Sequence, residues 1–280
     1  MHVSVLSIIF MTLSALISIG VPVHLFLFFR KRYDAKIFPM ILGAAAFIIF
    51  ALILESSIHR IVFNNFPLRE MPAPYIVYGI FMAGIFEETA RFIAFHILKR
   101  KYSKQRTEAS ELAHDNFGTG LAYGIGHGGI ESVLLAGVSM ILAIFASILV
   151  NTGNIEIITS RLQGEVLVAI NGQIEALAVT SPFMFLISGI ERLMAISIQL
   201  SLSVMVYYAV FGKRKIWLYP LAILSHAIVD IPAAAFQVGV LKSIAMVEGI
   251  IFLSAILLII LVRFLHKKNC CEISVPVQIP

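Results

Sequence analysis

The sequence predicts an all-α fold, a polytopic transmembrane helical bundle of about seven spans within a single integral membrane domain, residues 1–280. Three observations predict it. Hydrophobic residues make up 59% of the chain and charged residues only 13%, whereas a soluble domain carries roughly 25% charged residues. Apolar runs of about 20 residues, long enough to cross a bilayer, recur along the chain. Basic residues gather after every second run, as they do in cytoplasmic loops.

The predicted spans follow the apolar runs in order. The first run has no basic segment before it and is too long for the hydrophobic part of a cleaved signal peptide, so it predicts a retained span. The fourth is long enough for a tilted helix with extra turns, or for a break among its glycines that would give an eighth span. Ser181 and Pro182 are typical of a helix cap and first position, at the start of the fifth span. The runs cover residues 4–29, 38–58, 76–98, 118–150, 182–211, 216–237 and 243–265.

The loops carry their basic residues in a regular alternation. Clusters follow the first, third, fifth and seventh spans, and the positive-inside rule puts such loops in the cytoplasm. We therefore expect integration in the cell membrane with the N-terminus outside and the C-terminus cytoplasmic. The net charge of +5 reflects this topology and not nucleic-acid binding, because the clusters are short, flank spans and lack interleaved aromatic residues. The clusters are Arg30, Lys31, Arg32 and Lys36; Lys99, Arg100, Lys101, Lys104 and Arg106; Lys213, Arg214 and Lys215; and Lys267 and Lys268.

Residues 151–181 form the one long external loop between predicted spans. Within it, apolar residues recur at helical spacing between charged and amide side chains. This pattern is typical of an amphipathic helix that lies on a membrane surface. Such a helix is either a passive surface element or a lid over a site. The apolar positions are Leu162, Val166, Ile170, Ile174 and Leu177.

Three short clusters of ionisable residues interrupt the third, fourth and sixth runs. Each lies near the middle of its run, roughly 15 Å from either interface at about 1.5 Å per residue. A charge at the bilayer centre costs on the order of 2.5–3.5 kcal/mol, so these groups persist only where they face one another or water. The sequence therefore predicts a polar site within the membrane. The clusters are Glu87-Glu88-Thr89-Ala90-Arg91, His127-Gly128-Gly129-Ile130-Glu131 and His226-Ala227-Ile228-Val229-Asp230.

The first cluster combines two adjacent carboxylates with one guanidinium. Arg91 follows Glu87 by four residues and Glu88 by three, so it can reach either carboxylate over one helical turn. We expect one glutamate to be clamped and the other to serve as a general base, because two adjacent carboxylates in low dielectric cannot both stay ionised cheaply. The alternative is a structural ion pair between helices.

The other two clusters each pair a histidine with an acid four residues later on the same helical face. These pairs are His127 with Glu131 and His226 with Asp230. A neighbouring acid fixes the tautomer of a histidine and raises its basicity, as in metal and catalytic sites. Glycines around His127 admit either a closely packed helix or an extended substrate backbone. They are Gly118, Gly120, Gly124, Gly126, Gly128 and Gly129.

Together the motifs resemble those of the glutamate-dependent intramembrane proteases. This group includes the CAAX-processing and bacteriocin-processing enzymes and the PrsW-type proteases, and the spacing of the first motif is closest to the PrsW type. The glycine-rich segment 126–132 and the Glu191-Arg192 pair are most similar to the YhfC-type membrane peptidases, over most of the chain. The motifs are Glu87-Glu88-x-x-Arg91, then Tyr123-x-x-x-His127 or His127-x-x-x-Glu131, then His226-x-x-x-Asp230.

The resemblance implies a membrane-embedded peptidase that hydrolyses membrane-embedded or membrane-proximal peptides with a Glu-activated water. The catalytic candidates are Glu87, Glu88, Arg91, His127, Glu131, His226 and Asp230. Families of this kind have been described both as metalloproteases and as metal-free glutamate proteases, so either Zn²⁺ or no cofactor is implied. The candidate zinc ligands are Glu88, His127, His226 and either Asp230 or Glu131.

Two rival functions use the same residues. Intramembrane His, Glu and Asp pairs also suit a cation path, so a divalent-cation or proton-coupled transporter is the rival from another class. Such transporters often contain an inverted internal repeat, and the two halves of this sequence show none. A family member that has lost activity and only binds a partner peptide is the third hypothesis, although the intact ionisable set argues against it.

Overall fold

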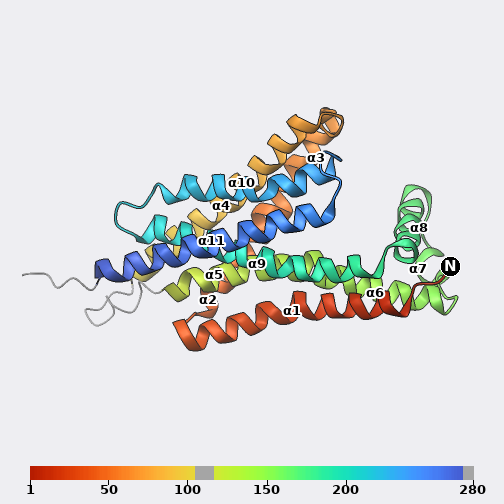
Figure 1. Cartoon of the computed structure of the whole chain (residues 1–280), viewed down its shortest axis with the longest axis horizontal. Coiled ribbons are helices and arrows are strands. Elements are labelled where there is room, and N and C mark those ends of the chain that lie inside the picture. The colour runs from red at the N-terminus through yellow and green to blue at the C-terminus, as the bar shows by residue number, and fades with distance from the viewer. Residues whose placement is uncertain (105–116, 274–280) are drawn as a thin grey trace, which may run out of the picture. The chain divides into compact units, whose positions relative to one another are not determined.

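The computed structural model describes residues 1–104 and 117–273, and every regular element in these ranges is helical (Figure 1). This confirms the predicted all-α membrane bundle. Of the basic residues predicted to face the cytoplasm, Arg106 lies outside the described residues. The elements are α1 Val5–Tyr33, α2 Ile37–Phe47, η1 Ile48–Glu55, α3 Ser56–Asn65, η2 Leu68–Glu70, α4 Pro72–Lys104, α5 Phe117–Ser132, η4 Val133–Gly137, α6 Val138–Asn151, α7 Glu156–Thr159, α8 Gly164–Val179, α9 Pro182–Phe211, α10 Leu218–Gln237 and α11 Ile244–Ile273.

Six helices in the described part of the chain are long and apolar enough to cross a membrane. They match six of the seven predicted spans. Two are composite: α2, η1 and α3 form one span over Ile37–Asn65, and α5, η4 and α6 form another over Phe117–Asn151. The fourth predicted span is therefore one helix with a π-helical segment, Val133–Gly137, in place of a break. The remaining prediction coincides with α4, whose 33 residues reach about 50 Å but include the first ionisable cluster.

The described chain divides into two compact units, and the boundaries fall within α1, α5 and α9. Unit 1 comprises residues 1–23 and 131–193, and unit 2 comprises residues 24–130 and 194–280. In unit 2 the C-terminal part of α9 is the central helix, since nearly every residue from Met194 to Val210 is buried or half-buried. Its apolar side chains form the main hydrophobic core together with residues of α4, α5, α10 and α11.

Glycines on α5 allow α9 to approach closely. A Cβ atom added at Gly120, Gly124 or Gly128 would lie 3.2, 3.0 or 2.7 Å from the nearest atom of α9. Small residues of this kind let helix backbones pack together where no hydrophobic force drives them. Helix packing, and not the approach of a substrate backbone, therefore explains these three glycines.

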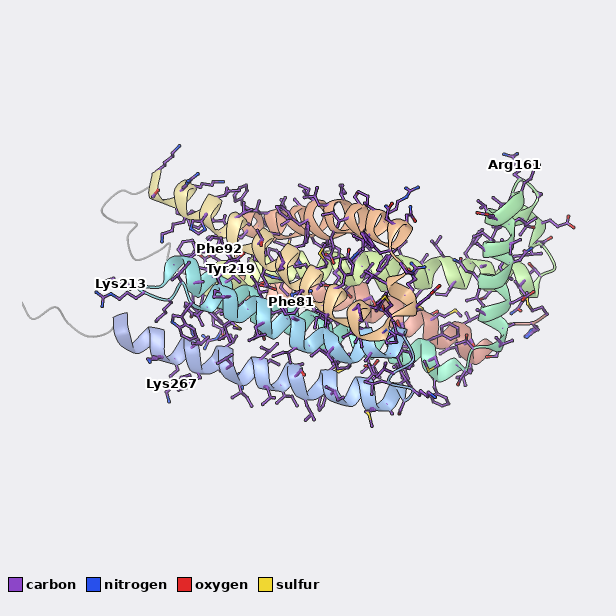
Figure 2. All side chains as sticks on the ribbon, turned by 90° about the horizontal axis from the view of Figure 1, so that it is seen from above. Phe81, Phe92, Arg161, Lys213, Tyr219 and Lys267 are labelled. Atoms are coloured by element: carbon purple, nitrogen blue, oxygen red, sulfur yellow. The ribbon has the colours of Figure 1, made fainter. Side chains whose placement is uncertain are left out.

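One end of unit 2 carries basic residues from several helices. Lys213, in the connection between α9 and α10, and Lys267, near the end of α11, lie at the same end of the unit (Figure 2). Phe92 of α4 and Tyr219 of α10 stack on the way to this end, with ring centroids 4.4 Å apart. A basic end is what the positive-inside rule requires of the cytoplasmic side. The orientation itself stays a prediction.

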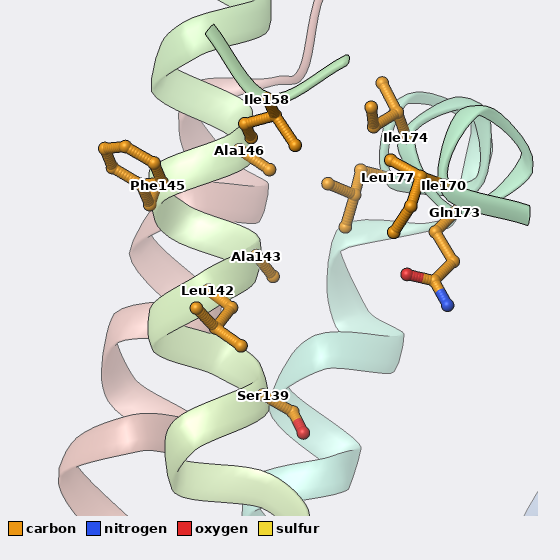
Figure 3. A pocket seen from close by; sticks show the side chains of 10 residues that line it. All are labelled: Ser139, Leu142, Ala143, Phe145, Ala146, Ile158, Ile170, Gln173, Ile174 and Leu177. Atoms are coloured by element: carbon orange, nitrogen blue, oxygen red, sulfur yellow. The ribbon is translucent and has the colours of Figure 1, made fainter. Parts of the chain in front are cut away.

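Unit 1 contains the helix predicted for the 151–181 loop. That helix is α8, and its residues Ile170, Ile174 and Leu177 face a cavity of about 460 Å³ beside α6 (Figure 3). The cavity is apolar apart from Gln173 and Ser139. Helix α8 spans Gly164–Val179 within the predicted loop, and its position at a membrane surface stays a prediction.

The packing of α4 on α10 gives a test of the fold. A Cβ atom at Gly84 of α4 would lie 2.9 Å from the backbone oxygen of Ile223, whereas a Cβ at Gly79 would meet nothing within 4 Å. We expect Gly84→Ala to be about 1–3 kcal/mol less stable than Gly79→Ala, because overpacking costs about that much. An unfolding titration in mixed micelles measures the difference. Equal stability of the two variants would contradict the close packing of α4 and α10.

Candidate active site

Three helices of unit 2 bring the predicted ionisable residues into one network. Helix α4 supplies the two glutamates and the arginine, α5 supplies a histidine, and α10 supplies a histidine and an aspartate. Five of these six residues are buried, and Asp230 is half-buried. The residues are Glu87, Glu88, Arg91, His127, His226 and Asp230.

Glu88 is held by two partners through one carboxylate oxygen. Its side chain is fully buried, and its Oε1 accepts a hydrogen bond from Arg91 Nη1 at 2.5 Å. The same oxygen lies 2.7 Å from His226 Nδ1. Because an ionised carboxylate can only accept, the histidine nitrogen is the donor in this pair. Glu88 therefore fixes both Arg91 and His226 in place.

Glu87 is the more accessible of the two glutamates. Its side chain keeps 10% of its surface uncovered, against 0% for Glu88. Its Oε2 lies 2.8 Å from His127 Nε2 and 3.1 Å from Gln199 Nε2, while Arg91 Nη2 is 3.4 Å away. Arg91 thus lies nearer to Glu88 than to Glu87, and the division of the two glutamates into a clamped residue and a base stays a prediction.

His226 lies between two carboxylates at unequal distances. Its Nδ1 contacts Glu88, whereas its Nε2 is 3.5 Å from Asp230 Oδ2. The longer separation exceeds that of a normal N–H···O hydrogen bond. Nε2 can therefore serve another acceptor when the ring is protonated at both nitrogens.

Two residues of α9 complete the network, and the sequence reasoning missed both. Gln199 contacts Arg91 through its Oε1 and donates to Glu87. Ser203 Oγ accepts from Arg91 Nε at 3.2 Å and donates to the backbone oxygen of Gln199 at 2.7 Å. A signal was available, because Gln199 and Ser203 repeat the four-residue spacing of polar pairs within an apolar run.

Glu55 and His59 are a further pair that the sequence reasoning missed. Glu55 ends the π-helical segment η1 and is buried, and its Oε1 lies 3.1 Å from His59 Nε2. The signal was again the four-residue spacing, here around a single glutamate in the second apolar run.

Glu131, the remaining candidate, belongs to unit 1. There its Oε1 lies 3.5 Å from Arg192 Nη1, and Arg192 also contacts the neighbouring Glu191. The alternative form of the second motif pairs His127 with Tyr123. These two residues belong to unit 2, where their rings stack with centroids 6.0 Å apart. The structure thus joins six of the seven predicted catalytic residues in one network and places the seventh in an ion pair with Arg192.

Comparison with known proteins gives the chain a family. The family model described as YhfC intramembrane metalloprotease matches residues 14–251. The chain belongs to this YhfC family. It is 34% identical over 255 residues to the "Uncharacterized membrane protein YhfC" of Bacillus subtilis strain 168, which covers 90% of this chain and 93% of that protein. No solved structure matches the chain. The resemblance to YhfC-type proteins is confirmed, and the relationship to the CAAX-processing and PrsW-type enzymes stays a prediction.

The name of the YhfC family implies a metal, and the donor set allows a test of that implication. Imidazoles and carboxylates are ligands that zinc accepts, and the buried atoms Glu88 Oε2 and His127 Nδ1 have no hydrogen-bond partner in the described chain. However, no three His, Cys, Asp or Glu side chains of the described residues group as metal ligands. Arg91 also places a positive charge against both glutamates. Repulsion between that charge and a dication means that the arrangement does not fit a zinc ion as it stands.

Proposed function

We propose that this YhfC-family chain is an intramembrane peptidase that hydrolyses membrane-embedded or membrane-proximal peptides with a water activated by Glu87. The observation that carries the proposal is the inequality of the two adjacent glutamates. Glu88 is fully buried and bonded to Arg91, while Glu87 contacts His127 and retains an uncovered surface. This is the division of roles that general base catalysis by one carboxylate of a pair requires.

Glu87 takes a proton from water while the water oxygen attacks the carbonyl carbon of the peptide. Donors on His127 and Gln199 orient the Glu87 carboxylate through Oε2, which directs the other oxygen to the water. The C–N bond then breaks, and the protonated Glu87 returns its proton to the departing nitrogen. A base that also serves as the acid needs no second carboxylate at the leaving group.

His226 is the group suited to stabilise the oxyanion. Negative charge develops on the carbonyl oxygen, and a preorganised donor in low dielectric stabilises that charge strongly. The His226 ring is held at Nδ1 by Glu88, and among the described residues its Nε2 has the long contact to Asp230. In its imidazolium form the ring carries a proton on each nitrogen, so Nε2 donates to the oxyanion while Nδ1 donates to Glu88. Arg91 holds the Glu88 that orients the ring.

Cleavage by metal-depleted protein tests this proposal. Purified full-length protein, dialysed against a chelator and reconstituted in liposomes, is mixed with a pooled set of single-span reporter peptides. We expect peptide cleavage, detected by mass spectrometry, at the same rate with and without added Zn²⁺, because no step uses a metal.

Two outcomes would overturn it. Cleavage that requires Zn²⁺ would replace the glutamate mechanism with a metal-dependent one. Zn²⁺ or proton uptake by the same liposomes, with no reporter cleaved, would favour the transporter.

A further inference from the structure

A second row of polar side chains lies beside the active-site network in unit 2. His59 of α3 links two elements, because its Nε2 lies 3.1 Å from Glu55 Oε1 and its Nδ1 lies 2.9 Å from Tyr78 Oη of α4. Helix α4 packs against η1, which ends at Glu55, and against α10, which carries Asp230. The row therefore joins η1, α3 and α4, and α4 connects it to the active-site network.

The row begins where the ends of α3, α4 and α10 meet. Helix α3 ends at Asn65, α4 starts at Pro72 after a short connection, and α10 ends at Gln237. Tyr75 Oη donates to Gln237 Oε1 at 2.8 Å, which ties two of the ends together. At about 1.5 Å per residue, Tyr78 lies about 9 Å along α4 from its start, Glu55 about 15 Å from the end of α3, and Glu87 about 22 Å along α4. Polar groups thus occur at increasing depth from this end to the active site.

His59 of the row and Asp230 of the active site keep surface that no protein atom covers. The side chain of His59 is 28% exposed and that of Asp230 is 36% exposed. If hydrocarbon covered these surfaces, each ionised group would cost on the order of 2.5–3.5 kcal/mol near the bilayer centre. Water on this face removes that cost.

The π-helical segment η1 sets which residues face the row. It covers Ile48–Glu55, and its wider turns shift the phase of the helix that continues into α3. Glu55 is buried, whereas Ile53 two residues earlier is 54% exposed. On α4 the same contrast separates half-buried Tyr78 from Val77, which is also 54% exposed. Each helix therefore has one polar and one apolar face at the same depth.

We propose that Glu55, His59 and Tyr78 line a hydrated access route from the end of unit 2 where α3 and α10 end and α4 begins to Asp230 and Glu87. The basic residues gather at the opposite end of the unit, so this end is the external one under the predicted topology. The route supplies the water that Glu87 activates, and in that respect the inference rests on the proposed function. A dry set of hydrogen bonds that only fastens α3 to α4 is the competing account.

Cysteine modification tests the route. The natural cysteines, Cys270 and Cys271, are first changed to serine, and single cysteines are then introduced in matched pairs. Glu55→Cys and Tyr78→Cys report on the row. Ile53→Cys and Val77→Cys report on the apolar faces of the same helices at the same depth. Intact cells are treated with a membrane-impermeant, positively charged methanethiosulfonate, and the thiols left unmodified are counted after denaturation.

We expect the two row cysteines to react at least about tenfold faster than their controls, because only a thiolate in contact with water reacts and lipid does not support ionisation. Protein covers Ile53 and Val77 less than it covers Glu55 and Tyr78. Faster labelling of the row cysteines would therefore reflect contact with water and not a lack of covering protein atoms. Equal rates within each pair would overturn the route, and so would modification only from the cytoplasmic side in inverted vesicles. Should Glu55→Cys not reach the membrane, the Tyr78 and Val77 pair decides alone. Labelling needs no catalysis, so failure of the route and failure of the peptidase proposal are separate results.

Discussion

Glu87→Gln is expected to reduce reporter cleavage by about 10²–10⁴-fold, the contribution of a positioned general base. The substitution preserves the shape of the side chain and leaves an amide oxygen to accept from His127 Nε2, which lies 2.8 Å from Glu87 Oε2. The amide cannot take a proton from water. Initial rates with reconstituted protein measure the loss, and changing Glu88 to Gln as well is expected to leave no detectable cleavage.

The matched control for this variant is Glu70→Gln. Glu70 is an exposed glutamate of η2 in the same unit, so its change removes one carboxylate without touching the network. It is expected to cleave at the wild-type rate. If Glu87→Gln protein, present in the membrane at the wild-type level, also cleaved at that rate, Glu87 would not be the base.

Arg91→Met is expected to lower the free energy of unfolding by about 3–5 kcal/mol, which is what breaking a buried ion pair costs. The Arg91 side chain has no exposed surface, and it contacts Glu88, Gln199 and Ser203. Methionine fills similar volume but leaves a buried carboxylate without its counter-charge. An unfolding titration in mixed micelles gives the free energy.

A double variant separates charge from packing in this prediction. Glu88→Gln combined with Arg91→Met removes both partners, so it is expected to recover part of the lost stability. Arg60→Met, at an exposed position of α3, is expected to change stability by less than about 0.5 kcal/mol. A double variant less stable than Arg91→Met alone would show that the pair is not the source of the cost.

Part of the candidate site could be predicted because two of its pairs are local. Arg91 reaches Glu88 over three residues, and His226 approaches Asp230 over four, so helical geometry alone puts each pair on one face. The same geometry could have identified Gln199 with Ser203 and Glu55 with His59. They were missed because a serine, an amide or a single glutamate in an apolar run carries a weaker signal than a run of charges.

Partners on different helices could not be predicted in this way. His127 was expected to share a site with Glu131, yet its Nε2 contacts Glu87 of α4, while Glu131 is paired with Arg192. Two residues four apart lie about 6 Å from each other along a helix, which is enough for a neighbouring helix to engage only one of them. Which one it engages depends on where that helix crosses.

By itself, the sequence determined that this protein is a bundle of membrane helices and that ionisable groups on three of them must meet inside it. Both conclusions follow from burial energy and helical periodicity, which act along the chain. Only the tertiary structure decided that Glu88 is fully buried while Glu87 keeps an uncovered surface, and that α9 supplies Gln199 between Arg91 and Glu87. The reason is physical: the rotation of each helix about its axis is set by side-chain packing, such as that of α9 against Gly124 and Gly128 of α5. No periodicity within a single helix contains that information.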